Sequence, residues 1–450
     1  MPGLIGPDEV RAVTEAALDL PGADGVEVLF LHEWGGLTRF ANSSIHQSTW
    51  REDTGVRVRV QTEGRIGVAA SNDFSKDGTR KAAASALEMA RVVRADPSFP
   101  GLAPQAEVPQ RQSGFDEATA ATTPEQRAEA VAALVAQTGN GFHAAGAYET
   151  SALEVAVENS LGQFCYFPQT QASVSTVVAG GEGGTGAAEA LAARHGEIDV
   201  EAAGRTAFQK ARDSQRPRDL EPGAYPVVLE PTAVNTLVAF LAYLGFGGRA
   251  ISEGRSPLSG REGQQVAAPS IHIYDDALSP DTLGLPFDFE GTPKRRVDLI
   301  DGGVFRGGVH DRRSAKLAGT ESTGHALPPP NPEGPFPLNL FLGTGDASLQ
   351  DMIGATQRGL LITRFHYSNV VHPMETIITG MTRDGTWWVE GGEVAYPVKN
   401  FRFTQSILGA LANVEMVGRE STLASEFFFA AARVPALKIS SFNFSGRSDH

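Results

Sequence analysis

The chain has 450 residues, of which 20% are charged and 41% are apolar, and this composition is typical of a globular protein rather than a disordered one. Its 53 acidic and 38 basic side chains give a formal net charge of −15, which argues against a nucleic-acid-binding protein because a phosphate backbone repels an anionic surface. The sequence has no apolar run of about 18 residues, so it predicts no membrane span.

Two features of the sequence bear on the cellular compartment. The N-terminal sequence MPGLIGPDEV has neither the basic region nor the apolar core of a secretory signal. Cys165 is the only cysteine, so the chain cannot form an internal disulfide or a cysteine-based zinc knuckle, and we expect this side chain to act as a small buried hydrophobe. We therefore expect a cytoplasmic protein.

The first half of the chain combines helical and extended patterns. Val56, Val58 and Val60 alternate with polar residues, which predicts a half-buried strand that turns back as a hairpin. Thr123 can cap a helix, with Gln126 completing a capping box. The predicted helices cover 8–20, 76–94, Thr123 to about 138, and 199–213, and the other predicted strands cover 25–34, 36–42, 146–159 and 163–178.

A glycine cluster, AGGEGGTGAAEA at 179–190, interrupts these patterns. Its glycines lack the spacing of a dinucleotide-binding loop, so we expect a mobile loop. A polar stretch at 213–223 follows, and we place a domain boundary near residue 220. This boundary divides the chain into an N-terminal domain, 1–220, and a C-terminal domain, 221–450.

The second half begins with a buried strand at 224–230 and a helix at 232–246 that is apolar almost all round, so we expect a buried helix. Short strands and turns then predominate. We expect a meander with turns at Asp384-Gly385 and Gly391-Gly392, and a final strand within 435–446. The fold class is therefore α+β: a mixed N-terminal α/β domain followed by a β-rich C-terminal domain.

Few side chains have the spacing of a catalytic or metal site. His32-Glu33 has no second histidine one helical turn further on, and a surface pair explains it better. His366, His372 and Glu375 could form a ligand set only if the intervening chain folded back. No G-x-S-x-G nucleophile elbow is present. The remaining candidates lie in sequences typical of turns: Ser256, Ser259, Ser322, Asp275-Asp276 and Asp311.

A proline-rich segment at 328–337 follows Thr323-Gly324-His325. Proline removes backbone donors, so this segment cannot be a central strand and should run as a stiff, extended loop. Such a loop could line a groove for an extended peptide, or it could be a packed surface connector, and both interpretations stay open. The candidate groove residues are Ser322, Thr323, Gly324, His325 and Asn339.

Four segments, in order along nearly the whole chain, resemble the TldD/PmbA family, whose PmbA-like branch is also called TldE. The resemblance implies an N-terminal α/β domain followed by a β-rich C-terminal domain, in agreement with the fold class above. The four segments are LTRFANSSIHQ at 37–47, SPLSGREGQQVAAPSIHIYDDA at 256–277, HDRRSAKLAGTESTGHA at 310–326 and TGMTRDGTWWVEGGEVAYPVKNFRFTQSI at 379–407.

The resemblance also locates a metal motif that this chain lacks. In the TldD branch, a helix carries HExxxH, and a distant cysteine adds a further zinc ligand. Aligning Gly245 with the family glycine places Leu241, Ala242 and Phe246 at the three motif positions, and none of them can bind zinc. The C-terminal region has no cysteine. The resemblance therefore implies the TldE branch, with no metal and no catalytic residue in this chain.

The TldE branch implies a particular kind of assembly. The expected partner is a TldD-like, HExxxH-bearing subunit that holds zinc, and the expected substrates are unfolded peptides, including ribosomal peptide or natural-product precursors. Two other hypotheses stay open. The chain could be a self-sufficient hydrolase with a relocated site at His325, His372 and Glu375, or a homomeric peptide-binding or scaffold protein, including a homodimer when isolated.

Overall fold

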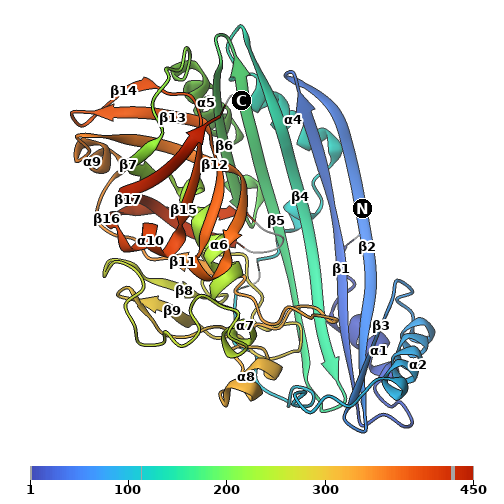
Figure 1. The fold of residues 1–450 in the computed structure, drawn as a ribbon. Helices are drawn as coiled ribbons and strands as arrows, with labels where there is room; N and C mark the ends of the chain where they lie inside the picture. The colour runs from blue at the N-terminus through green and yellow to red at the C-terminus, as the bar shows by residue number, and fades with distance from the viewer. Residues whose placement is uncertain (1–2, 113, 427–430, 449–450) are drawn as a thin grey trace.

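The computed structural model describes residues 3–112, 114–426 and 431–448. Its strands form two sheets, a first sheet of six strands and a second sheet of eleven. Figure 1 shows the long strands of the first sheet as one tall layer, with β7 to β17 gathered on its left. No helix within the described ranges is both long and apolar enough to cross a membrane.

The first sheet is antiparallel throughout, in the order β3-β2-β1-β4-β5-β6. Its strands are β1 (Gly25–Ala41), β2 (Ser44–Thr62), β3 (Arg65–Ser71), β4 (Phe142–Asn159), β5 (Phe164–Gly180) and β6 (Gly184–Ala192). The helices of this half are α1 (Pro7–Thr14), α2 (Lys76–Val92), α3 (Glu117–Ala120), α4 (Pro124–Val135) and α5 (Val200–Asp213), with single 3-10 turns η1 (Glu15–Ala17) and η2 (His195–Glu197).

Helices cover one face of the first sheet. Val56, Val58 and Val60 pack there against α2, which confirms the predicted half-buried strand. The predicted capping box also forms, since the Thr123 hydroxyl accepts the Gln126 backbone N–H at 3.2 Å and the Gln126 side chain accepts the Thr123 N–H at 2.8 Å. The alternation of side chains along a strand thus sends every second residue of β2 toward the helices.

The opposite face of the first sheet meets the second half of the chain. Leu285 and Phe287 pack there against Cys165 and neighbouring residues of β1, β4 and β5. Arg57 and Arg59, which alternate with the valines, also lie on this side: Arg57 donates to the Pro329 carbonyl at 2.9 Å. The polar positions of this strand therefore face a protein junction rather than open solvent.

The second sheet closes on itself over part of its length. Strands β17, β15, β13, β12 and β7 each pair with the next, and β7 pairs in turn with β17. Phenylalanines pack closely together on these strands, with Phe365 and Phe403 ring centroids 4.4 Å apart. The strands of this sheet are β7 (Gly223–Leu229), β8 (Ile273–Asp275), β9 (Val297–Asp301), β10 (Val304–Phe305), β11 (Asn339–Leu342), β12 (Arg358–His372), β13 (Ile377–Glu390), β14 (Glu393–Pro397), β15 (Phe401–Ser406), β16 (Val414–Ser425) and β17 (Ala431–Arg447).

The long helix of the second half, α6 (Pro231–Gly245), packs against β12 and β17. Eleven of its fifteen residues are buried, as the nearly uniform apolar sequence predicts. The shorter helices of this half are α7 (Gly248–Ser252), α8 (Arg312–Ala318), α9 (Leu349–Gly354) and α10 (Ile407–Ala412), with one 3-10 turn, η3 (Pro373–Glu375). The observed fold class is α+β, as predicted, whereas the domain boundary near residue 220 stays a prediction.

The prediction of a mobile loop at 179–190 is wrong. Residues 181–183 form a tight turn between β5 and β6, and most of the glycine cluster is strand. A Cβ atom at Gly186 would lie 2.3 Å from the Ala207 carbonyl oxygen of α5. The glycines therefore let α5 approach the backbone of β6, and their abundance reflects close packing rather than flexibility.

Two other local predictions need correction. Asp384-Gly385 is not a turn between strands but a bulge inside β13, where Asp384 has a φ of 56° and the pairing with β12 shifts by one residue. The strands predicted at 25–34 and 36–42 are one continuous strand, because Gly35 keeps its register with both neighbours. Gly391-Gly392 does form the turn between β13 and β14.

We predict that Gly186→Ala destabilises the protein by about 1–3 kcal/mol, because the added methyl group would overlap backbone atoms of α5. The measurement is the free energy of unfolding in denaturant. Gly196→Ala is the matched control, since nothing lies within 4 Å of a Cβ atom there, and its effect should stay within about 0.5 kcal/mol. Equal effects of the two substitutions would contradict the packing role of Gly186.

Candidate functional site

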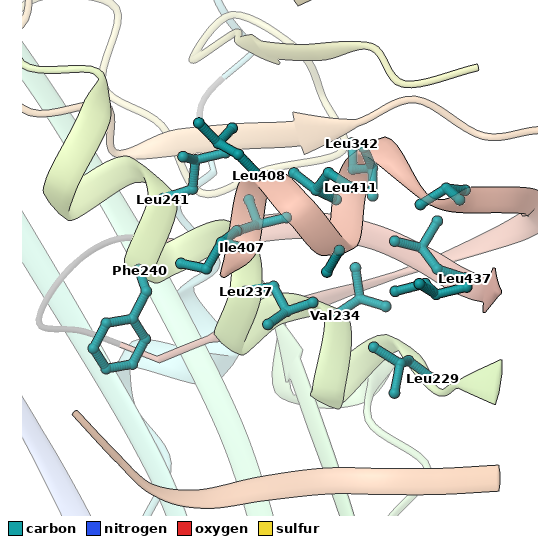
Figure 2. Close-up of a cluster of buried hydrophobic side chains, with 14 of the residues drawn as sticks. Leu229, Val234, Leu237, Phe240, Leu241, Leu342, Ile407, Leu408, Leu411 and Leu437 are labelled. Atoms are coloured by element: carbon teal, nitrogen blue, oxygen red, sulfur yellow. The ribbon is translucent and has the colours of Figure 1, made fainter. Parts of the chain in front are cut away.

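Three residues of this chain align with the zinc motif of the TldD branch. All three lie in the interior of the second half. Leu241 is 0% exposed, Ala242 1% and Phe246 0%. Figure 2 shows Leu241 on α6 beside Leu408, within a cluster of leucine, isoleucine and valine side chains from α6, α10 and the neighbouring strands. All three side chains are hydrocarbon, so no atom of theirs can coordinate a metal ion.

A zinc ion does not fit this environment. A divalent ion placed among apolar side chains loses its hydration without gaining ligands, which costs far more than such a packed cluster could offset. Among residues 3–112, 114–426 and 431–448, no three or more histidine, cysteine, aspartate or glutamate side chains are grouped so as to hold a metal. The three motif positions therefore supply no ligand for metal chemistry.

A small cavity adjoins the same helix. Asn235, Ala239 and Ala242 follow one another at helical spacing along α6 and line it, together with Glu426 and other described residues. Its volume is about 10 Å³, enough for one water-sized atom. Ala242, the position aligned with the motif glutamate, therefore presents a methyl group rather than a carboxylate to this small cavity.

A larger cavity of about 510 Å³ lies at the junction between the first sheet and the second half. Glu189 of β6 and Arg364 of β12 line it, as do Lys210 and Glu230, which form an ion pair. Burial raises the pKa of Glu189, although Arg364 and the Thr232 hydroxyl act in the opposite direction. Sequence patterns did not single out these residues, because the cavity forms only when segments far apart in the chain come together.

The candidate groove residues form a buried hydrogen-bond network. Thr323 is 5% exposed, His325 1% and Asn339 2%. The His325 Nε2 atom lies 2.9 Å from Asp275 Oδ1, and its Nδ1 atom lies 2.9 Å from the Thr323 hydroxyl. Gly324 is also buried and Ser322 half-buried, with its hydroxyl donating to the His310 carbonyl. These side chains hold the segment in place, and their contact with a peptide stays a prediction.

Asp275 is not a solvated turn residue, contrary to the sequence interpretation. It is 0% exposed, and its second oxygen accepts the Asn339 backbone N–H at 2.7 Å. Burial alone would raise its pKa, but His325, Lys294 and the backbone N–H lower the pKa of Asp275 below its usual range. Burial lowers the pKa of His325, although Asp275 acts in the opposite direction. The Nδ1 atom lies 2.9 Å from the Thr323 carbonyl oxygen as well as from its hydroxyl, so contacts on both sides hold the ring in place.

The proline-rich segment lies outside any strand, as predicted, but it is a bent loop rather than an extended one, with bends at 328–330 and 332–333. Asn331 closes a local turn by accepting from the Glu333 backbone N–H and donating to the Gly334 carbonyl. Residues 329–332 and Gly334 line a cavity of about 570 Å³, which Arg59 of β2 and Phe99 line from the first half. The same segment accepts hydrogen bonds through its carbonyl groups from Arg57 and Arg249. It is therefore packed against both halves and also borders a cavity, whereas its contact with a peptide stays a prediction.

The structure does not bring the relocated-hydrolase candidates together. His325 is bonded to Thr323 and Asp275, whereas the Nδ1 atom of His372 accepts the Glu375 backbone N–H at 3.2 Å. His372 and Glu375 are exposed at the end of β12, while His325 is buried. The contacts of each group are local, so these side chains do not form one site in this chain.

The remaining sequence candidates have structural roles. The Ser256 hydroxyl donates to the Gly245 carbonyl at 2.7 Å, Ser259 donates to Ile251, and the Asp311 carboxylate caps α8. Cys165 is 2% exposed, and burial raises its pKa to about 12. The expectation of a small buried hydrophobe is therefore confirmed for Cys165. His32 is buried against Glu154 rather than forming a surface pair.

Comparisons with known proteins agree with this arrangement. A model described as the PmbA/TldA metallopeptidase C-terminal domain matches residues 222–446, and one described as PmbA/TldA metallopeptidase domain 1 matches residues 26–90. The chain belongs to the PmbA/TldD family. The resemblance of the sequence to the TldD/PmbA family and the predicted fold class are thereby confirmed.

Three relatives illustrate the extent of the similarity. A metalloprotease of Methanothermobacter thermautotrophicus is 24% identical over 83% of each chain, and the metalloprotease PmbA of Escherichia coli O157:H7 is 23% identical over 96% of each chain. The crystal structure of TldE from Thermococcus kodakarensis matches with a TM-score of 0.87 and 21% identity, covering 98% of this chain and 99% of that chain. The family fold therefore extends over nearly the whole chain.

We predict that Leu241→Ala destabilises this family member by about 2–5 kcal/mol, since it leaves a cavity in a fully buried apolar cluster. Leu317→Ala is the matched control, because Leu317 is 51% exposed, and it should change stability by at most about 0.5 kcal/mol. Denaturant unfolding measures both. A small effect at Leu241 would show that the motif position is not part of the packed core.

A further prediction concerns Glu27 of β1, which lies at the junction between the two halves. Both of its carboxylate oxygens are buried without a hydrogen-bond partner, and Arg59, 3.4 Å away, is shared with Glu290. Burial raises the pKa of Glu27 from 4.5 to about 7, against the effect of Arg59. The folded protein thus keeps this proton to a higher pH than the unfolded chain does. The contribution of Glu27 to the free energy of unfolding is therefore complete below pH 4.5 and is lost as the pH rises through the raised pKa.

Glu27→Gln should therefore remove a pH-dependent contribution of about 1 kcal/mol per pH unit within this window. The measurement is the free energy of unfolding of the parent and the variant from pH 5 to about 8. Glu129→Gln on α4 is the control, because Glu129 is exposed. Parallel stability curves for the parent and Glu27→Gln would contradict the protonated state of Glu27.

Proposed function

We propose that this chain is a non-catalytic, TldE-type subunit of a zinc metallopeptidase complex. The observation that carries the proposal is that Leu241, Ala242 and Phe246 occupy the motif positions as buried hydrocarbon. In this proposal, a TldD-like partner bearing HExxxH supplies the zinc ion and the water-activating glutamate. The substrates are unfolded peptides, including ribosomally made precursors, and the complex is cytoplasmic.

The role of this chain in the complex is to enclose and hold the peptide. Two cavities, of about 510 and 570 Å³, lie where its two halves meet, and each is large enough for part of an extended peptide. An extended peptide can be held by backbone hydrogen bonds, which tolerate many side chains. An enclosed site of this kind admits unfolded chains and excludes folded proteins. These features support a peptide-holding subunit better than a catalytic one.

Co-expression tests this proposal. The full chain is purified alone and together with an HExxxH-bearing homologue encoded beside it, and cleavage of an unfolded peptide is assayed for both. We expect co-purification, and cleavage only by the complex. Replacing the motif glutamate of the partner with glutamine should abolish cleavage without preventing assembly.

The alternatives predict different results in the same assay. Cleavage by the isolated chain that is lost in His372→Ala or Glu375→Gln would overturn the proposal in favour of a relocated hydrolase. A chain that forms homodimers, binds peptide and recruits no HExxxH-bearing homologue would instead be a homomeric peptide-binding or scaffold protein.

A further inference from the structure

The free edge of β6 faces a cavity between the two halves of the chain. β6 is the last strand of the first sheet and, among the described residues, it pairs only with β5. Figure 1 shows β6 beside α5, and Ala188 and Ala190 line the cavity from the α5 side of the strand. Ala187 and Glu189 line the same cavity from the opposite face, because side chains alternate along β6. The cavity of about 510 Å³ therefore extends around the edge of β6.

The contacts of Ser214 show which way the backbone groups of β6 point. The Ser214 hydroxyl, at the C-terminal end of α5, accepts the Thr185 backbone N–H at 3.0 Å and donates to the Thr185 carbonyl at 2.8 Å. Both backbone groups of Thr185 therefore point away from β5. In an antiparallel pair such groups point alternately toward and away from the partner strand, and β5 and β6 pair over 184–192 without a register shift. The N–H and C=O groups of Ala187 and Glu189 therefore also point away from β5, on the side where the cavity lies.

These four backbone groups have no partner in the described part of the chain. Neither a backbone group nor a side chain there forms a hydrogen bond with the N–H or C=O of Ala187 or Glu189. The two residues lie about 6.8 Å apart along the strand, and each presents one donor and one acceptor. An extended main chain presents its own donors and acceptors at this same spacing, so it matches all four groups at once. A single ion matches either the donors or the acceptors, but not both.

The charged side chains of the cavity do not select a charged ligand. Within the described ranges, the two basic side chains that line it already have acidic partners: Lys210 pairs with Glu230, and Arg364 donates from Nε to Asp384 at 2.7 Å. The cavity therefore offers a ligand the backbone groups of β6 rather than an unpaired cation.

The cavity is open to solvent and has room for side chains. Glu189, Thr206 of α5 and Thr422 of β16 line it and are exposed, so a ligand can enter from outside. Much of the remaining lining consists of alanine, glycine and serine residues from β4, β5, β6 and α5. These small residues leave space beside an added strand, so no particular side chain is required of the ligand.

We propose that the edge of β6 binds a substrate peptide as an additional strand of the first sheet. The peptide lies along Ala187 and Glu189 in the cavity and forms main-chain hydrogen bonds with both residues. This inference rests on the proposed function, since the peptide is its substrate, and it adds the place of binding and a recognition mode that depends on the main chain. We name the edge formed by Ala187 and Glu189 the strand site.

Proline at position 187 tests the strand site. Ala187→Pro removes the N–H that faces the cavity and keeps the pairing with β5, because that N–H points away from β5. The probe is a fluorescent, unstructured peptide of serine, alanine and threonine, and fluorescence anisotropy measures its affinity for the isolated full chain and for the complex. We expect Ala187→Pro to weaken binding about fivefold or more, because one hydrogen bond is lost and the proline ring occupies the edge. Leu191→Pro is the matched control, since Leu191 has the same orientation on β6 but does not line the cavity, and it should change the affinity by less than about twofold.

A second pair of variants leaves β6 unchanged. Thr206→Trp fills the cavity from α5, since Thr206 is exposed on that helix and lines the cavity, and it should also weaken binding about fivefold or more. Gln209→Trp is its control, because Gln209 is exposed on the same helix but does not line the cavity. Circular dichroism checks the folding of each variant, and this pair decides the question if Ala187→Pro does not fold.

Two copies of the peptide test recognition of the main chain. A copy with its central amides N-methylated should bind the parent chain about fivefold or more weakly, because a methylated amide cannot donate to the carbonyl groups of Ala187 and Glu189. A copy with glutamine and valine in place of alanine and threonine should bind within about threefold of the original, because its main chain is unchanged.

The outcomes distinguish this inference from the proposed function. Equal peptide binding by the parent chain, Ala187→Pro and Thr206→Trp, in a complex that forms and cleaves peptide, would overturn the strand site and leave the proposed function intact. A dimer of the isolated chain that Ala187→Pro dissociates, with no peptide binding by the parent, would assign this edge to a second copy of the chain and overturn the strand site. If no complex forms, the proposed function fails, and peptide binding by the same variants of the isolated chain still decides whether the strand site exists.

Discussion

The packing of α6 constrains the rest of the second half. The helix is enclosed by the closed strands of the second sheet, by α10 and by the segments that follow it, so nearly every side chain it presents must be apolar. Leu241 and Phe246 meet this requirement, and in doing so they provide no atom that could coordinate a metal ion. The stability of this region and the lack of metal ligands at these two positions thus have the same origin.

The junction between the two sheets follows from the alternation of side chains along the strands. One face of the first sheet is covered by helices, and the other receives Leu285 and Phe287 from the second half. The junction also encloses charges, such as Arg59 with Glu290, and it leaves cavities beside them. Apolar contacts therefore hold the halves together, and polar residues line the cavities between them.

Local patterns were sufficient to predict several elements. The valines of β2, the capping box at Thr123 and the uniform hydrophobicity of α6 each depend on neighbouring residues alone, and each forms as expected. The glycine cluster at 179–190 was misinterpreted because the close approach of α5 requires glycine there, and α5 is not part of the neighbouring sequence from which the loop was predicted. The bulge at Asp384-Gly385 likewise depends on the register with β12.

The candidate site shows the same division. The alignment with the family identified the motif positions on α6, because that assignment needs only the residue types in sequence. The buried state of Asp275 and the cavity beside Glu189 could not be predicted in this way, since they arise where β8, β6 and distant loops meet. The sequence thus identified the zinc motif that α6 lacks, and the structure identifies the cavities between the two halves.

Metal analysis of the isolated full-length chain tests the central claim most directly. The purified protein is incubated with equimolar zinc, passed through a gel-filtration column and measured by elemental analysis. The account predicts far less than one zinc ion per chain, because the motif positions are packed hydrocarbon. One tightly held zinc ion per chain would contradict it.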